Sequence, residues 1–446
     1  MSMGTRKRRV RQQELWTATA SLPRAASHPF YERLNAILDE RHFDEFVEDL
    51  CQRFYADRNG RPGLAPGIYF RALLVGYFEG IDSERGIAWR ACDSLSIRSF
   101  LRIALDEEAP DHSTLSRTRR LIDLETHQRV FQWMLVLLAE HGLIKGRTIG
   151  VDATTLDANA ALRSIVRRDS GEAYEEFLKR LAKESGIETP TREQLAKLDR
   201  KRPKKGSNQQ WTNPHDPDAR ITKMKDGRTH LAHKAEHAVD LETGAIVAVT
   251  LQAADRGDTT TMVETLAQAG ERIAEVAAQT NSEETGERVL ADGPRDLVAD
   301  KGYHSRNAVA AVQQAGVRSY ISEPTRPRQR WNGQRQQQQA VYGNRRRIRS
   351  KFGKALLRSR GERVERTFSH VYDTGGMRRT HLRHHPNILK RLLVQVCAFN
   401  LGLIVRNLIG KGTPRGLQGA PGNSTEALKT LRFALQLTIL LLSDWK

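Results

Sequence analysis

The chain has 446 residues, of which 39% are hydrophobic and 28% charged, a balance that excludes a disordered chain and suffices for two or three globular domains. Lys and Arg outnumber Asp and Glu by 72 to 53, so the formal net charge is +19, which favours a polyanionic partner. Charge alone leaves nucleic-acid, ribosome and membrane-surface binding open.

Neither secretion nor membrane insertion is indicated. The three cysteines are far apart and form no CxxC pair, which gives no sign of a zinc site or a disulfide framework. The first 11 residues are basic but lack an apolar core, and the longest apolar stretch, 433–442, is too short to span a bilayer. We therefore expect a protein of the reducing cytoplasm.

The N-terminal third is expected to be helical. Residues 1–28 form a basic arm, and residues 29–143 are predicted to be an all-α domain for DNA binding and dimerisation. Apolar residues recur at helical spacing at 72–78 and again at 130–138, and prolines and glycines separate these segments.

Segment 111–120 is a candidate DNA-reading helix, because Asp111 or Ser113 can cap its start. Its exposed face is expected to carry four residues that contact DNA: Ser116, Arg117, Arg119 and Arg120. With a helix at 83–91, it would form a helix-turn-helix. An amphipathic helix with a solvated basic face explains the pattern equally well.

Residues 144–405 alternate between strands and helices. Strands are predicted at 147–152, 230–240, 245–251, 297–300 and 317–321, and helices at 258–279, 306–314 and around residue 365. Three antiparallel strands followed by two parallel ones, with helices on both faces, make an α/β fold with a ribonuclease-H-like mixed sheet. Residues 160–228 read as a polar insertion, and residues 406–446 as a C-terminal tail.

A second insertion, predicted at 325–354, opens a stretch that runs to residue 360 without any acidic residue. Aromatic residues interleaved with the positive charges favour contact with nucleic acid over a solvated face. The candidate DNA contacts in this segment are Arg328, Arg330, Trp331, Arg345, Arg346, Arg347, Arg349 and Lys351. Trp331 either stacks on a flipped base or packs the segment onto the body.

Three acids carry the candidate chemistry. Asp152 and Asp300 each end a predicted strand, and these two strands are neighbours in the predicted sheet. Glu365 lies on the last helix, next to its buried face, with Glu362 as its rival. Carboxylates that converge from separate elements suit two Mg²⁺ ions, which activate a nucleophile and stabilise the leaving oxygen in phosphodiester cleavage. Taken singly, Asp300 fits a turn and Glu365 fits a surface ion pair, while Asp258 is a spare acid that fits a helix cap.

The segments around these three acids resemble those of bacterial insertion-sequence transposases of the DDE class. The resemblance covers roughly residues 30–405. Segments 150–160, 299–305 and 364–368 match the family's three acid-bearing blocks, the third with the companions 375–379 and 398–401. Segments 216–220 and 234–240 also fit, as does segment 110–114 in the N-terminal domain.

The resemblance implies a cut-and-paste transposase whose Asp152, Asp300 and Glu365 bind two Mg²⁺ ions, with Mn²⁺ as a substitute. Water attacks the element end, and the freed 3′-hydroxyl attacks target DNA. The implied partners are terminal inverted repeats, target DNA and a second copy of the chain in a homodimer, and the implied location is the bacterial nucleoid. A nuclease without strand transfer and a disabled, DNA-binding transposase remain alternatives.

The sequence departs from some relatives around the third acid. Those relatives have Tyr, Arg and Lys at fixed spacing about the Glu, whereas here Gly361 precedes it by four residues and Tyr372 follows it by seven. Arg363, Arg366 and Arg378 are the candidates for the missing phosphate contact, and Arg366 is counted among the expected DNA contacts.

Overall fold

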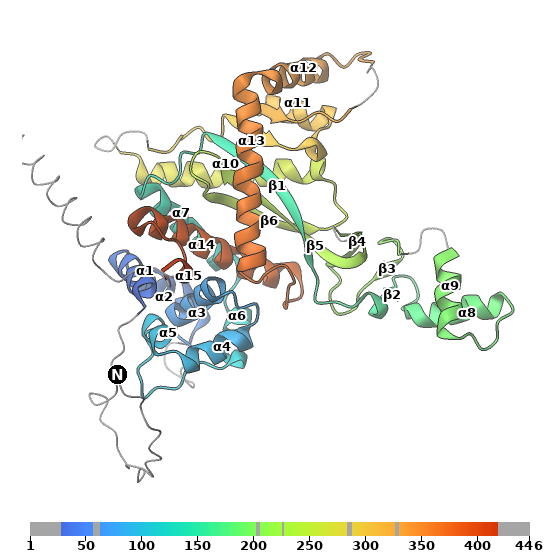
Figure 1. Ribbon diagram of the computed structural model, residues 1–446, viewed down its shortest axis with the longest axis horizontal. Helices are drawn as coiled ribbons and strands as arrows, with labels where there is room; N and C mark the ends of the chain where they lie inside the picture. The colour runs from blue at the N-terminus through green and yellow to red at the C-terminus, as the bar shows by residue number, and fades with distance from the viewer. Residues whose placement is uncertain are drawn as a thin grey trace, which may run out of the picture.

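The computed structural model describes residues 28–56, 63–201, 206–224, 227–282, 288–325 and 330–417. Arg328, one of the candidate DNA contacts, lies outside these residues. The described part is a mixed α/β structure, in which a central sheet is flanked by helices and joined to a cluster of N-terminal helices (Figure 1).

The sheet has six strands, β4 (Arg220–Lys223), β5 (Thr229–Asp240), β1 (Thr148–Asp157), β7 (Asp296–Ala299), β8 (Arg318–Ile321) and β6 (Ile246–Ala253). The first five lie in that order, and β6 pairs with β5 beyond the end of β4. Pairing is antiparallel among β1, β5 and β6 and parallel from β1 through β7 to β8. This is the ribonuclease-H-like arrangement, so the predicted fold class is confirmed.

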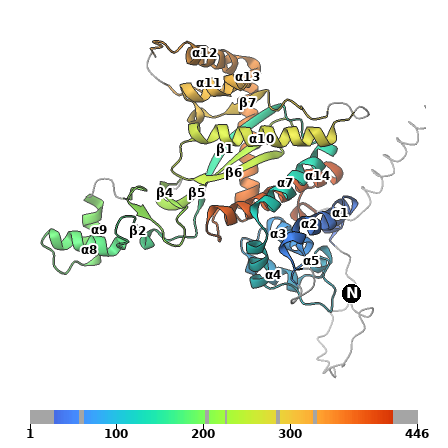
Figure 2. The same cartoon turned by 180° about the vertical axis from the view of Figure 1, so that it is seen from behind.

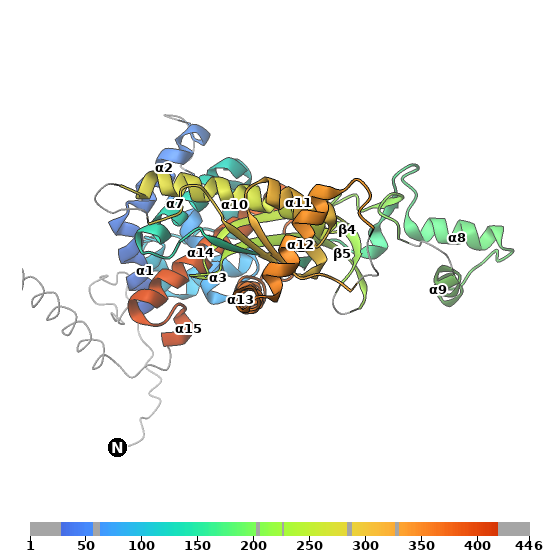
Figure 3. The same cartoon turned by 90° about the horizontal axis from the view of Figure 1, so that it is seen from above.

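Two long helices cover opposite faces of the sheet. Helix α13 (Lys351–Phe368) crosses in front of the sheet in Figure 1, and α10 (Asp258–Thr280) crosses in front of it in the view from behind in Figure 2. Successive side chains of β5 point to opposite faces of the sheet. Glu236 contacts Thr261 and Thr265 of α10, whereas the next residue, His237, contacts Thr367 of α13. Figure 3 shows the resulting layers from above.

The remaining helices of this half are α11 (Arg306–Gln314) and α12 (Arg335–Arg349), which pack on β8. A short 3-10 turn, η4 (Lys301–Tyr303), follows β7, and a π-helical turn, η5 (Ser369–Thr374), follows α13.

The N-terminal helices share a hydrophobic core with the sheet. They are α1 (Pro29–Glu40), α2 (Phe43–Cys51), the 3-10 turn η2 (Gln52–Phe54), α3 (Pro66–Glu79), α4 (Glu84–Asp93), α5 (Leu95–Phe100), α6 (His112–Leu121) and α7 (Leu124–Glu140). Helix α14 (His385–Ile409) joins the two halves, because it packs on α3 and α7 and also on β6. A single cluster of buried apolar side chains therefore runs from α1 to α14.

Within the described residues, one helical stretch, His385–Leu417, is long and apolar enough to cross a membrane. It contains α14 and the short α15 (Pro414–Leu417). Of its most apolar window, 72% is buried inside the protein, as in the core helix of a folded domain.

The polar insertion forms a projecting lobe with a small core of its own. The lobe contains η3 (Leu162–Ser164), β2 (Val166–Arg167), α8 (Tyr174–Glu184), α9 (Arg192–Lys201) and β3 (Trp211–Thr212), and it extends to the right in Figure 1. Trp211 is buried at its centre, against Phe177 and Tyr174. The expected limit of 228 is too late, because β4 belongs to the main sheet.

Several expected boundaries differ from the structure for identifiable reasons. Strand β1 does not end at Asp152, since its pairing with β5 continues as far as Asp157. The basic insertion contains regular structure: α12 and the start of α13 occupy much of it, separated by Ser350, whose hydroxyl caps α13. The expected domain end at 405 falls inside α14, which runs to Ile409.

Buried histidines make the fold sensitive to acid. His127 is fully buried between Tyr69 and the Asp123 carbonyl, and burial lowers its pKa from 6.5 to about 3. The unfolded chain therefore binds a proton that the folded chain excludes, so stability falls as pH drops below about 6.5. We expect a loss of about 2 kcal/mol from His127 between pH 7 and pH 5.

Urea unfolding at both pH values tests this, with His127→Gln as the comparison. The variant keeps a hydrogen-bonding group beside Tyr69 but does not titrate, so its loss between pH 7 and pH 5 should be smaller by about 2 kcal/mol. Equal losses in the two proteins would show that His127 is not kept neutral by burial.

Candidate active site and DNA-binding surface

The sheet register brings Asp152 and Asp300 together. Parallel pairing of β1 with β7 matches Gly150 with Val298 and stops there. Asp152 follows Gly150 by two residues and is still in β1, and Asp300 follows Val298 by two residues and lies in the turn after β7. A Cβ atom added at Gly150 would lie 3.2 Å from Val364 of α13, so this face of β1 is covered by α13. Side chains two residues apart in a strand share a face, and Asp152 therefore lies on the same covered face.

Arg360 of α13 joins the two acids. Its Nη1 lies 3.0 Å from Oδ2 of Asp152, and its Nη2 lies 3.8 Å from Oδ2 of Asp300. The Arg360 side chain is only 9% exposed, whereas that of Asp300 is 44% exposed. Arg360 was not among the residues singled out from the sequence, because one more Arg in a basic helix carries no signal of its own.

Burial raises the pKa of Asp152, and the nearby carboxylates of Asp300 and Asp258 raise it further. The guanidinium of Arg360 and the backbone N–H of Ala153 oppose this shift. Asp300 is held differently, since its Oδ1 accepts a hydrogen bond of 2.7 Å from the backbone N–H of Gly302. Asp152 is therefore an acid whose charged form depends on a cation beside it.

Glu365, the expected third acid, lies on α13, the helix that also carries Arg360. It lies five residues after Arg360, and its side chain is exposed. Val364 and Phe368 are buried, as expected for the packed face of this helix. The rival acid Glu362 forms an ion pair of 3.6 Å with Arg366.

Arg378, one of the three arginines considered for a phosphate contact, is tied to the strand that carries Asp152. Its Nη1 donates to Oγ1 of Thr154, which stands two residues after Asp152 on the same strand face. Tyr372 is buried and bonds to Nε2 of His237 at 2.6 Å, so it is engaged inside the core. Arg363 and Arg366 line a different hollow, beside Gly244 and α14.

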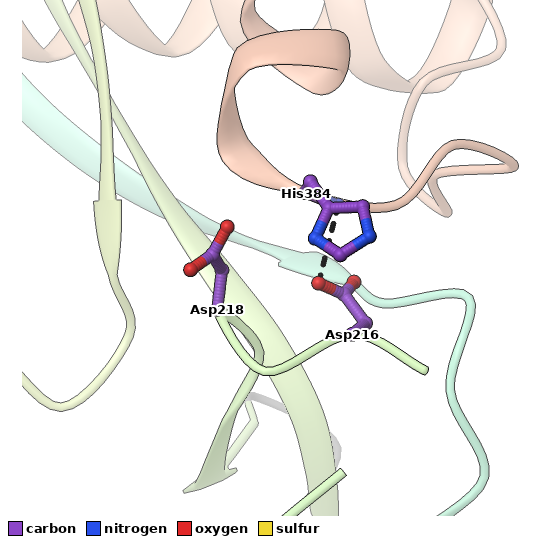
Figure 4. Close-up of side chains that lie close together, drawn as sticks. All are labelled: Asp216, Asp218 and His384. Atoms are coloured by element: carbon purple, nitrogen blue, oxygen red, sulfur yellow. Dashed lines mark hydrogen bonds between the residues drawn. The ribbon is translucent and has the colours of Figure 1, made fainter. Parts of the chain in front are cut away.

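A second cluster of possible metal ligands contains Asp216, Asp218 and His384, with ligand atoms within 4.8 Å of one another (Figure 4). Asp216 accepts from the His384 backbone N–H at 3.2 Å, and its other oxygen contacts Nε2 of His233 at 3.1 Å. Asp218 accepts from the His385 backbone N–H at 2.9 Å. These carboxylates therefore cap the free N–H groups at the start of α14 and tie the loop before β4 to it.

Two family models match the chain. The model described as "Transposase domain (DUF772)" matches residues 20–121, and the model described as "Transposase DDE domain" matches residues 201–401, which include Asp300, Arg360 and Glu365. The chain belongs to the insertion-sequence transposases of the DDE family. No curated protein and no solved structure matched it.

This assignment confirms the resemblance inferred from the sequence, and it makes the protein a DNA-binding enzyme of transposition. The DDE domain belongs to a family that generally depends on divalent metal ions. The matched range begins after β1, so Asp152 is placed in the site by the sheet register rather than by the match.

The expected DNA-reading helix of the transposase exists, but its surroundings differ. Helix α6 begins after Asp111, whose carboxylate accepts the N–H of Thr114 at 2.6 Å. It packs on α4, yet α5 and a connection of irregular structure separate the two helices, so no short turn joins them. Arg117 and Arg120 are exposed, and Ser116 is half-buried.

Arg119 is not on the exposed face, and that expectation was wrong. Its side chain is 9% exposed, its Nε lies 2.7 Å from Oε1 of Glu84, and its Nη1 donates to Asn387 of α14. The helix turn that exposes Arg117 and Arg120 directs Arg119 inward. Arg119 therefore fastens α6 to α4 and α14.

The basic residues of α12 also divide into two groups. Arg345 pairs with Glu323 at 2.6 Å, and Arg347 donates to the carbonyl and hydroxyl of Ser319. Both guanidinium groups are therefore held by the protein, and the expectation that they are free to contact DNA is corrected. An exposed group remains at the end of α12 and the start of α13: Arg346, Arg349 and Lys351. Arg330, before α12, is exposed as well.

Trp331 packs onto the body of the protein. The guanidinium of Arg306 lies 4.6 Å from its ring centroid, and the ring meets Tyr342 edge-on at 5.9 Å. The side chain is half-buried against the main core. Base stacking by Trp331 stays a prediction, and it would require the ring to leave these contacts.

The contrast between Arg119 and Arg120 gives a direct test of the surface. Arg119→Gln should destabilise the protein by about 3 kcal/mol, because it leaves the largely buried Glu84 without its partner. Arg120→Gln should leave stability unchanged and weaken DNA binding, lowering the slope of log affinity against log salt by about 1. Urea unfolding and DNA-binding titrations between 50 and 200 mM salt measure both effects. Weaker DNA binding by Arg119→Gln at unchanged stability would contradict the buried role.

Proposed function

We propose that this transposase excises and inserts its element by a cut-and-paste reaction, in which metal-dependent hydrolysis of a phosphodiester is followed by strand transfer. The observation that carries the proposal is the placement of Asp152 and Asp300 side by side where the parallel pairing of β1 and β7 ends. Glu365 on the crossing helix α13 is the proposed third acid, and its exposed side chain is free to turn toward bound metal and DNA.

The donor set fits magnesium. Asp152 and Asp300 offer carboxylate oxygens, the ligands that Mg²⁺ prefers, and Asp300 is open to solvent and substrate. Two Mg²⁺ ions, or Mn²⁺ in their place, would be held by Asp152, Asp300 and Glu365, and would supply nucleophile activation and stabilisation of the leaving oxygen. The raised pKa of Asp152 is what burial next to other acids produces, and a cation favours its charged form.

Side chains around the acids have separate tasks in this proposal. Arg360 holds Asp152 and Asp300 in position from the side of α13. Arg378, fixed to Thr154 and Asp373, places a guanidinium beside the acids, where it can bind the phosphate that flanks the scissile bond. Arg117 and Arg120 of α6 and the exposed residues Arg346, Arg349 and Lys351 would bind the DNA backbone further away.

The proposed DNA partners are the terminal inverted repeats of the element and a target duplex. The proposed active form is a homodimer that pairs two element ends. The shared core between the N-terminal helices and the sheet supports joint action of the two regions, because a DNA end bound by α6 keeps a fixed relation to the acids.

Substitution of the acids tests the chemistry. Asp152→Asn, Asp300→Asn and Glu365→Gln should each lower the rate of cleavage of a labelled element end in Mg²⁺ by about a thousandfold or more, the equivalent of several kcal/mol. DNA binding should persist, because the acids do not contribute positive charge. Glu362→Gln is the matched control on α13, and it should cleave at the wild-type rate.

The products separate the alternatives. Joining of the cleaved end to target DNA supports the transposase reaction, and cleavage without joining would indicate a nuclease. Binding of a confirmed end sequence without cleavage in Mg²⁺ or Mn²⁺ would indicate a disabled transposase. Equal losses in Glu362→Gln and Glu365→Gln would remove the special role of Glu365.

A further inference from the structure

Asp258 stands beside the two core acids, on the side away from Arg360. It is the first residue of α10 and was expected only to cap that helix. At Gly302 in the turn after β7, a Cβ atom would lie 2.7 Å from Oδ2 of Asp258 and 3.0 Å from Oδ1 of Asp300. The missing side chain of Gly302 therefore lets two carboxylate oxygens from different elements face the same small space.

Within the residues that the structure describes, one oxygen of Asp258 has a charged hydrogen-bonding partner. Its Oδ1 lies 2.5 Å from Nζ of Lys234, which also donates to Oγ1 of Thr261. The Lys234 side chain is 5% exposed and that of Asp258 is 40% exposed. The ion pair thus fixes the carboxylate from the inside and leaves Oδ2 toward Gly302 and Asp300.

Glu236, the other acid near Lys234, is not available to a ligand. It is fully buried, and its two oxygens accept hydrogen bonds from Thr261, Thr265 and Tyr303. Its Oε1 lies 4.0 Å from Nζ of Lys234, against 2.5 Å for Asp258. Of the acids that α10 and β5 bring to this edge, Asp258 is the one with an oxygen directed at the site.

We propose that Asp258 is a further carboxylate ligand of the metal centre, bound together with Asp152 and Asp300. This inference rests on the proposed function, since it concerns the same metal ions. Asp258 already faces Asp300 across Gly302 in this structure, whereas the side chain of Glu365 is exposed. Carboxylates from β1, from the β7 turn and from α10 offer Mg²⁺ or Mn²⁺ oxygen ligands from three directions.

Metal binding without DNA tests the inference. The concentration of free Mn²⁺, followed by electron paramagnetic resonance, gives the affinity of the purified full-length chain and of its variants. Asp258→Asn should weaken binding of at least one Mn²⁺ by about tenfold or more, and Asp152→Asn should also weaken it. Glu264→Gln, which removes an exposed charge from the same helix, is the control and should bind as the wild type does.

A double variant separates a ligand from a mere counterion of Lys234. Lys234→Met with Asp258→Asn removes both partners of the ion pair. Weak binding in the double variant as well supports direct ligation, whereas recovery of wild-type affinity would overturn it. Wild-type affinity in Asp258→Asn together with weak binding in Asp152→Asn would also overturn it, while the proposed metal site would stand. Absence of Mn²⁺ binding in the wild-type chain would defeat both.

Discussion

The point at which β1 and β7 stop pairing organises the active edge of this transposase. Up to Gly150 the two strands are held together, and beyond it β1 continues along β5 while β7 turns away at Asp300. Asp152 is therefore carried by a strand that is still rigidly paired on its other side, and Asp300 by a tight turn that its own carboxylate closes through Gly302. One acid is fixed by the sheet and the other by a local hydrogen bond.

Charge balance explains the basic residues behind this edge. Four carboxyl groups, those of Asp152, Asp300, Asp258 and Glu236, are gathered around the end of β7, and two buried cations, Arg360 and Lys234, pair with them from opposite faces of the sheet. Like charges gathered in one place repel one another, and the repulsion is strong where burial lowers the effective dielectric constant. Two cations compensate this repulsion in part, which leaves an excess of negative charge suited to a divalent ion.

The sequence was enough to predict the order of strands and helices, because strand and helix periodicities alternate clearly from residue 144 onward. It also predicted that Asp152 and Asp300 lie together, because their segments carry both a strand pattern and a family motif, and the structure places both beside Arg360. The role of Arg360 and the position of Asp258 depend on how α13 and α10 cross the two faces, which a periodicity does not report. For the same reason Arg119 was misplaced: a helical pattern shows which residues share a face, but not which neighbour covers it.

Several motif residues outside the acid triad serve the architecture. Asp216 and Asp218 cap α14, Asp240 accepts the N–H groups of Lys145 and Gly146, and Asn400 of α14 bonds to the backbone of Ile246 in β6. Asp216 and Asp218 join the loop before β4 to α14, Asn400 joins the β5–β6 hairpin to the same helix, and Asp240 ties the start of β1 to the end of β5. Because α14 also receives Arg119 through Asn387, helix α6 and the acid-bearing sheet are attached to the same helix. If α6 binds a DNA end as proposed, the shared core would hold that end in a fixed relation to the acids.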